Sequence, residues 1–153
     1  MMYCFWFLLL SVINFALCQD CVIENFEYNY ESDFNNNYGS CSGYLRWSIK
    51  QYSSLQYSIK SPHLGSTRFV TVQSPLRCIS SFNFTMTGGG TIEVNRYMTT
   101  RHYENEMSVL VFRIADAGTV EIVAEHHSFM IDFVPGWQTL TLSIPGLSSF
   151  TGY

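Results

Sequence analysis

The sequence has few charged residues. Asp, Glu, Lys and Arg make up only 13% of its 153 residues, whereas globular proteins average about 25%. Long surface helices need Glu and Lys, so this composition argues against a helix-rich fold. With a formal net charge of −4 and no run of Lys or Arg, the chain also lacks the positive surface that binding to nucleic acid or to an anionic membrane requires.

The first 18 residues carry no charged side chain and are almost entirely apolar. A secretory signal needs an apolar stretch of about 7–15 residues, followed by small residues before the cleavage site. Ala16 and Cys18 provide such residues for cleavage after Cys18. A membrane anchor is the alternative, but it needs about 20 apolar residues and Asn14 interrupts sooner. We therefore predict that residues 1–18 are a signal peptide, and that the mature chain, residues 19–153, is secreted and has no transmembrane segment as given.

Export changes the interpretation of the cysteines. Cys4 and Cys18 leave with the signal peptide, so Cys21, Cys41 and Cys78 remain in an oxidising compartment. Cys21 and Cys41 bracket a polar loop rich in Asn and Tyr, and closing a loop of about 20 residues stabilises a fold by roughly 3 kcal/mol. We predict this disulfide. Cys78 is then a buried free thiol, an intermolecular bridge, or half of a pair whose partner the chain lacks.

Apolar and polar residues alternate along most of the chain, which is the pattern of half-buried strands. We expect strands within the segments 44–49, 55–59, 69–72, 79–87, 92–94, 107–114, 120–124, 129–134 and 140–144. No stretch has a sustained period of 3.6 residues. The pattern predicts a single all-β domain, an antiparallel sandwich or barrel.

Some strands allow more specific expectations. In segment 79–87, Phe82, Phe84 and Met86 should point inward, and the three glycines that follow predict a hairpin turn into segment 92–94. Segment 107–114 is apolar on both faces and should be a central strand. In the next strand the side chains of Val120, Ile122 and Ala124 should share one face. In the last strand those of Leu140, Leu142 and Ile144 should point together to one face.

No group of residues points to catalysis or to a cofactor. His126 and His127 are neighbours on an expected strand and point to opposite faces, so they cannot jointly bind a metal. We expect them, like His63 and His102, to be solvated turn histidines. Glu104 and Glu106 lie near Arg101 in an expected polar loop and are interpreted as surface charges. The chain has no Gly-x-Ser-x-Gly motif and no phosphate-binding loop, so we predict no enzymatic activity, no cofactor and no metal site.

One modification site has a clear chemical basis. Asn83-Phe84-Thr85 is an acceptor for N-glycosylation in an exported chain. Strand alternation places Asn83 on the face opposite Phe82 and Phe84. We therefore expect any sugar at Asn83 to project outward.

Several motifs resemble those of a known family when they are taken in order. They are Cys21 to Glu27 (CVIENFE), Cys41 followed by Trp47, Ser74-Pro75-Leu76 before Cys78, Thr87 to Val94 (TGGGTIEV), and Pro135-Gly136-Trp137-Gln138. Together they cover about residues 21–144. Their order and spacing resemble the MAM domain, an extracellular module of meprins, neuropilins and receptor tyrosine phosphatases.

The resemblance implies a jelly-roll-like β-sandwich that serves adhesion or recognition without catalysis. It also implies that Cys21 pairs with Cys41, and that Cys78 pairs with a fourth cysteine that this sequence does not contain. We therefore expect the domain, residues 19–153, to be incomplete at its C-terminal end. Some MAM domains bind a cation near the Phe-Glu opening, where Glu27 is the matching position; we expect Glu27 to be a solvated charge.

The favoured function is that of a secreted or cell-surface binding module that contacts an extracellular protein partner or a second copy of itself. The alternative is a carbohydrate-binding β-sandwich, or an accessory domain of a secreted hydrolase. In that case Tyr28, Tyr30 and Tyr38 would stack on sugar rings. Packing of these tyrosines over their own loop is the interpretation we favour.

Overall fold

The computed structural model describes residues 24–28, 33–35, 39–55, 59–72, 77–98, 106–129 and 134–153. Residues 1–18, Cys21, Tyr30, Tyr38 and His102 lie outside the described residues, as do Arg101 and Glu104. Within them the strands are β1 (Phe34–Asn35), β2 (Ser48–Gln51), β3 (Arg68–Thr71), β4 (Ser80–Ser81), β5 (Phe84–Thr87), β6 (Thr91–Met98), β7 (Glu106–Ile114), β8 (Val120–Phe129), β9 (Gly136–Ser143) and β10 (Ser149–Gly152). Three short 3₁₀ helices complete the regular structure: η1 (Gly39–Cys41), η2 (Tyr52–Ser54) and η3 (Asp116–Gly118). The protein is mostly β, as its alternating pattern predicts.

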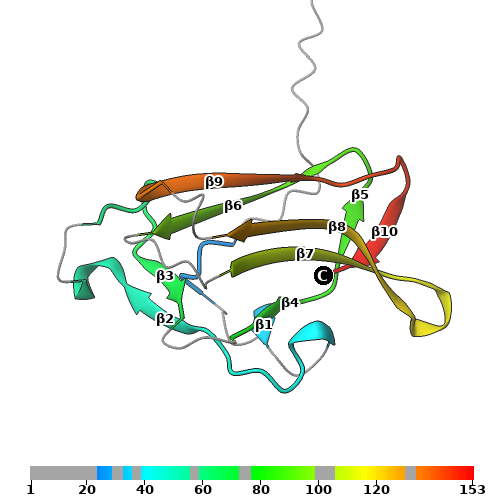
Figure 1. The fold of residues 1–153 in the computed structure, drawn as a ribbon, viewed down its shortest axis with the longest axis horizontal. Helices are drawn as coiled ribbons and strands as arrows, with labels where there is room; N and C mark the ends of the chain where they lie inside the picture. Colours follow the sequence, from blue (N-terminus) through cyan, green and yellow to red (C-terminus); the bar gives the residue numbers. More distant parts are fainter. Residues whose placement is uncertain are drawn as a thin grey trace, which may run out of the picture.

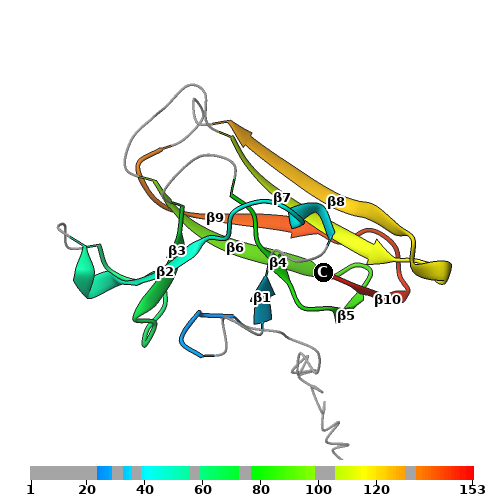
Figure 2. The ribbon, with the colours of Figure 1, turned by 90° about the horizontal axis from the view of Figure 1, so that it is seen from below.

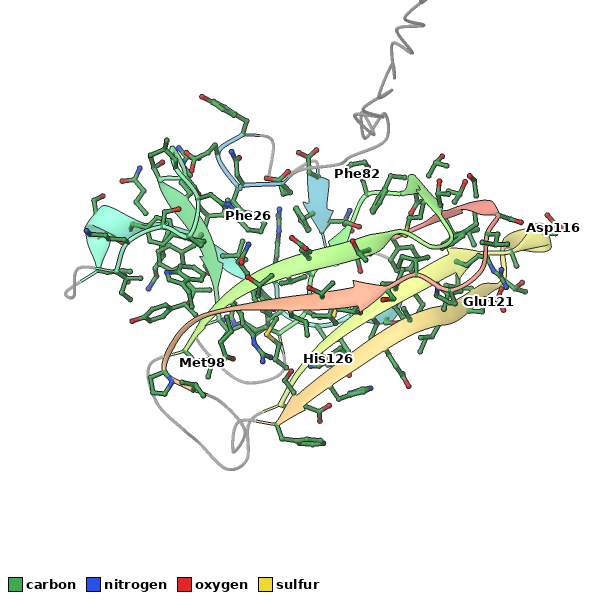
Figure 3. The ribbon with its side chains drawn as sticks, turned by 90° about the horizontal axis from the view of Figure 1, so that it is seen from above. Phe26, Phe82, Met98, Asp116, Glu121 and His126 are labelled. Atoms are coloured by element: carbon green, nitrogen blue, oxygen red, sulfur yellow. A yellow bond between two sulfur atoms is a disulfide. The ribbon has the colours of Figure 1, made fainter. Side chains whose placement is uncertain are left out.

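The largest sheet is antiparallel and has the strand order β5-β10-β7-β8 (Figure 1). β7 and β8 form a long hairpin that η3 connects. The prediction that residues 107–114 form a central strand is confirmed, because β7 lies between β10 and β8. Among the described strands, β8 has a neighbour on one side only, and Figures 2 and 3 both show it as the outermost strand of this sheet.

Among the described residues, three two-stranded antiparallel sheets accompany the large one. β6 and β9 pair over eight residues, from Thr91 opposite Ser143 to Met98 opposite Gly136. β2 pairs with β3, and β1 pairs with β4. The expected strand at residues 69–72 is confirmed as β3, whereas Leu55 and Ile59 lie outside the strands, with the residues between them not described.

The hydrophobic core joins the large sheet to the β6–β9 pair. Its buried members come from both, namely Met86 and Val111 from the large sheet, and Leu140, Leu142 and Ile144 from β9 and the residue after it. Each buried aliphatic side chain contributes about 1.5–3 kcal/mol relative to an exposed one. The predicted inward direction of Leu140, Leu142 and Ile144 is therefore confirmed.

The predicted hairpin between residues 79–87 and 92–94 is wrong. β5 pairs with β10, and β6 pairs with β9, so the glycine turn connects two different sheets. The turn packs against a second turn: the Gly89 N–H donates to the Ile144 carbonyl at 2.8 Å, and the Ile144 N–H donates to the Gly90 carbonyl at 2.9 Å. A Cβ on Gly88 would lie 2.5 Å from the Gly146 carbonyl carbon. Glycine permits this close approach, and the approach makes the turn a corner rather than a hairpin.

The expected strand 79–87 is also divided into two. β4 pairs with β1 and β5 pairs with β10, and between them the Phe82 N–H donates to the Asp33 carbonyl at 2.8 Å. This bond continues the β1–β4 register by one residue, so the chain leaves that ladder at Phe82 and enters the ladder with β10 at Phe84. The predicted alternation survives the division, because Met86 is buried, Phe82 and Phe84 are half-buried, and Asn83 is exposed.

The predicted face of β8 is wrong at its start. Val120 and Ile122 are 47% and 50% exposed, whereas Val123 and Ala124 pack against the core. Val111 pairs with Ala124 and the next residue, Phe112, pairs with Ile122, so Val123 is an extra residue in the ladder. A β-bulge of this kind moves the side chains that precede it to the opposite face. β8 ends at Phe129, and residues 130–133 of the expected 129–134 strand lie outside the described part of the chain.

The structure corrects the predicted cysteine pairing. Cys41 forms a disulfide with Cys78, and their Cα atoms are 5.1 Å apart. The predicted Cys21–Cys41 bond is therefore wrong, and so is the prediction that Cys78 lacks a partner within the chain. The Cys78 N–H donates to the Leu45 carbonyl at 3.0 Å. This backbone hydrogen bond holds the segment around Cys78 beside the segment around Leu45. The spacing of the cysteines along the sequence does not predict this contact.

A search of the described residues for a helix of sufficient length and hydrophobicity to cross a membrane finds none.

Candidate functional site

The most connected group of polar side chains lies on the β7–β8 hairpin. His127 Nδ1 lies 2.6 Å from Glu106 Oε1 and 2.9 Å from Ser108 Oγ. His127 Nε2 lies 3.5 Å from Glu125 Oε2. The hairpin register places His127 directly opposite Ser108, and Glu125 lies two residues before His127, so all four side chains lie on one face of the sheet.

The charges of this cluster support one another. Hydrogen bonds that the His127 ring donates to Glu106 and, with less effect, to Glu125 raise the pKa of His127 above its ordinary value. In return, hydrogen bonds from His127 and Ser108 lower the pKa of Glu106. The side chains remain partly exposed to water, at 43% for both His127 and Glu106. The cluster therefore favours a protonated His127 between two carboxylates.

This geometry suits an ion-pair cluster better than a nucleophile and its base. In a serine hydrolase the histidine meets the serine through one ring nitrogen and a carboxylate through the other. Here Nδ1 of His127 contacts both Ser108 and Glu106, and Ser108 Oγ also donates to Glu106 Oε1 at 2.9 Å. The Ser108 hydroxyl thus donates its hydrogen bond to the Glu106 carboxylate, and His127 forms its ion pair with the same carboxylate.

Exposed apolar side chains lie on the same face of β8 as this cluster. Phe129, opposite Glu106 in the register, is 55% exposed, and Val120 and Ile122 share this outward direction. We call Val120, Ile122, Glu125, His127 and Phe129 the β8 outer face. Large apolar groups next to a charged cluster are typical of surfaces that contact other macromolecules.

The structure separates the histidines that the sequence places together. His126 is opposite Val109, which packs against the core, so it points to the inner side of the sheet while His127 points outward. Both lie in a strand, which corrects the prediction that they are turn histidines. His63 does lie in an exposed turn, with its Nε2 2.7 Å from Asn95 Nδ2. In the part of the chain that is described, no three His, Cys, Asp or Glu side chains are arranged to hold a metal ion.

Glu27 is a tether and not a freely solvated charge. Its carboxylate accepts hydrogen bonds from the Thr67 N–H at 2.5 Å, the Thr67 hydroxyl at 2.6 Å and the Arg68 N–H at 2.8 Å. These bonds, the Thr67 hydroxyl first, lower the pKa of Glu27. The carboxylate therefore attaches the N-terminal segment to the start of β3.

Asn83 and Tyr28 are both accessible. Asn83 is exposed between β4 and β5, as its place in the alternating pattern predicts, so a sugar attached there would extend into solvent. Tyr28 is 80% exposed, which contradicts the interpretation that this tyrosine packs over its own loop.

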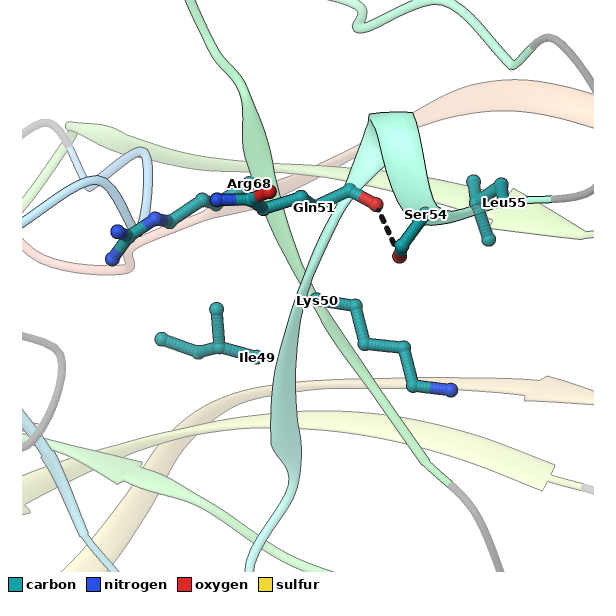
Figure 4. Close-up of a pocket in the computed structure, with 6 residues that line it drawn as sticks. All are labelled: Ile49, Lys50, Gln51, Ser54, Leu55 and Arg68. Atoms are coloured by element: carbon teal, nitrogen blue, oxygen red, sulfur yellow. Dashed lines mark hydrogen bonds between the residues drawn. The ribbon is translucent and has the colours of Figure 1, made fainter.

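An open hollow lies beside η2, with a volume of about 590 Å³. Its lining consists of Ile49, Lys50, Gln51, Ser54, Leu55 and Arg68 (Figure 4). The Ser54 hydroxyl donates to the Gln51 carbonyl at 2.7 Å, while the charged ends of Lys50 and Arg68 point away from each other (Figure 4). Because the two cations diverge, they do not form a joint binding site for an anion.

A second exposed surface lies on the β6–β9 pair. The ring of Trp137 meets that of Tyr97 edge-on with centroids 5.2 Å apart, and its Nε1–H donates to the Lys60 carbonyl at 2.7 Å. The same face carries Asn95, which accepts a hydrogen bond from the Thr139 hydroxyl at 2.7 Å. The sequence alone does not predict this group, because Tyr97 and Trp137 become neighbours only through the register of β6 and β9.

Comparison with known proteins finds no relative. No family model matches the sequence, no curated protein matches it, and no solved structure matches its fold.

Proposed function

We propose that the chain is a secreted or cell-surface binding module without catalytic activity, and that it acts through protein–protein contacts. The observation that carries this proposal is the β8 outer face, which presents half-exposed Val120, Ile122 and Phe129 on the same side of the strand as the charged His127 cluster. Burial of such side chains against a partner is favourable, and the charges would orient that partner.

The proposal includes export and a sandwich architecture. Residues 1–18 have the composition of a signal peptide, and a disulfide such as Cys41–Cys78 is typical of oxidising compartments. A core that draws on two sheets supports a jelly-roll-like β-sandwich. Membership of the MAM family rests on the ordered motifs alone, and the Cys41–Cys78 bond departs from the pairing which that resemblance implies.

The test uses the full chain, expressed with its own first 18 residues in cultured eukaryotic cells. The protein should be collected from the medium and begin at Gln19. After labelling, it should bind to cells that have a surface partner, and protease treatment of those cells should abolish binding while glycosidase treatment should not. Ile122→Asp should weaken binding at least about tenfold, whereas Thr141→Asp, on an exposed face of the other sheet, should not.

The alternative function, binding of carbohydrate, has an observation of its own. The β6–β9 surface combines the aromatic pair Tyr97 and Trp137 with the polar side chains of Asn95 and Thr139, and sugars are recognised by such combinations of rings and hydrogen-bonding groups. Binding to a glycan array that is lost in Tyr97→Ala and kept in Ile122→Asp would favour this function. Loss of cell binding on glycosidase treatment would count against the protein-contact proposal.

A further inference from the structure

β8 is the edge of the four-stranded sheet and carries the residues for a second strand to pair with it. Among the described strands it is bonded only to β7, and it is the outermost strand of this sheet in the views from below and from above (Figures 2 and 3). An edge strand offers N–H and C=O groups that another chain can pair with. Natural edges are commonly protected by Lys, by Pro or by a β-bulge. β8 contains no Lys or Pro, and its bulge at Val123 precedes the segment from Ala124 to Ser128.

The charges of β8 are arranged to select the strand that pairs with it. Glu125 and His127 lie on the outer face at alternate positions, 3.5 Å apart. A neutral strand laid along this edge would remove water from Glu125 and His127 and supply no charge of its own, which is unfavourable. The partner that this edge favours therefore carries a positive group opposite Glu125 and a negative group opposite His127.

β8 itself meets this requirement when it runs antiparallel to a copy of itself. A two-fold axis at His126 places Glu125 opposite His127 of the second copy, and His127 opposite Glu125 of the second copy. Directly opposite residues share a face of the sheet, so both charge pairs form on the outer side. The segment from Ala124 to Ser128 follows the bulge and keeps a regular register with β7.

The apolar residues of the same strand extend this contact. With the axis at His126, the exposed ring of Phe129 lies at the end of the paired segment, beside the bulge of the second copy. Phe129 is 55% exposed in the single chain, and contact with a second copy would remove part of this surface from water. The two matched charge pairs and the partial shielding of Phe129 then support one alignment of the two strands.

We infer that the chain forms a two-fold symmetric homodimer through antiparallel pairing of β8 with β8 of a second copy, centred on His126. This inference rests on the proposed protein-contact function and names a second copy of the chain as the partner. The two four-stranded sheets then join into one continuous sheet, which is a common form of symmetric association.

The experiment is sedimentation equilibrium of the full secreted chain and its variants, at a pH of about 6. The unaltered protein should be a dimer at micromolar concentration. Glu125→Lys places Lys opposite His127, and His127→Glu places Glu opposite Glu125, so each change should raise the dimer dissociation constant by about tenfold. The double variant E125K/H127E restores opposite charges and should return the constant to within a few-fold of the original.

Controls separate this inference from misfolding and from the function on which it rests. Glu93→Lys makes the same charge change on exposed β6 and should leave dimerisation unaltered, and thermal unfolding should show that every variant is folded. A folded, monomeric wild-type chain overturns the inference, as does a double variant that stays as weak as the single ones. If that monomer still binds protease-sensitive partners on cells, only the inference fails; if it binds nothing, the proposed function fails as well.

Discussion

At the scale of single residues, the charge of His127 depends on Glu106, which lies on the other strand of the β7–β8 hairpin. Glu106 provides the strongest support for the protonated ring, and Glu125 adds to it. Sequence reasoning places Glu106 in a polar loop and His127 in a turn. The pairing of β7 with β8 brings them to 2.6 Å instead, because residues 21 positions apart become cross-strand neighbours only in this register.

The raised pKa of His127 leads to a pH prediction. The protonated ring contributes stability that is fully present below pH 6.5 and is lost as pH rises through the raised pKa. Glu106, with its lowered pKa, contributes stability that is present above pH 4.5 and is lost as pH falls through that lowered pKa. The pair should therefore stabilise the fold most between these two values.

A proton NMR titration of the histidine rings checks this. Glu106→Gln should lower the pKa of His127 the most, and Glu125→Gln should lower it less. Glu93→Gln, a change on β6, should leave it where it is. A His127 pKa that does not respond to Glu106→Gln would contradict the arrangement of this cluster.

At the scale of elements, the disulfide connects η1 to the segment before β4. It links residues 37 positions apart, and in the chain-entropy treatment a closed loop of this length stabilises the fold by about 4 kcal/mol. The double variant Cys41→Ser/Cys78→Ser should lose roughly this free energy of unfolding in urea. A peptide map without reductant should join Cys41 to Cys78, and a Cys21–Cys41 peptide in its place would show that the observed pairing is wrong.

The corner between β5 and β6 depends on one glycine. Gly88→Ala places a Cβ 2.5 Å from the Gly146 backbone, and backbone atoms cannot yield as a flexible side chain can. We expect a loss of about 1–3 kcal/mol in the free energy of unfolding. Gly65→Ala is the matched control: its φ is +86° but it has open space, so it should cost only the backbone strain, about 1 kcal/mol. Equal losses for the two variants would contradict the close approach of the turns.

At the scale of the whole molecule, the core makes the two main sheets depend on each other. Leu142 of β9 is 4% exposed and belongs to the same cluster as Val111 of β7. Leu142→Ala should therefore cost about 2–5 kcal/mol and should lower hydrogen-exchange protection in β7 as well as in β6. The neighbouring Thr141→Ala faces solvent and should change stability by less than about 0.5 kcal/mol. Loss of protection confined to β6 and β9 would show that the sheets unfold separately.

The alternating sequence determined the mostly β character, the central position of β7 and the burial of Leu140, Leu142 and Ile144. These properties follow from a period of two residues, which is local and can be recognised without knowing the partners of a strand. The tertiary structure alone decided that β5 and β6 enter different sheets, that Cys41 meets Cys78, that Val120 and Ile122 face outward, and that Glu106, Ser108 and His127 form one cluster. Each of these depends on a contact between distant segments: the approach of Gly88 to Gly146, the bond from Cys78 to Leu45, or the extra residue Val123 in the β7–β8 ladder. A bulge changes the face of every residue before it, so the exposed apolar surface on which the proposed function rests could not be located from the pattern of residues.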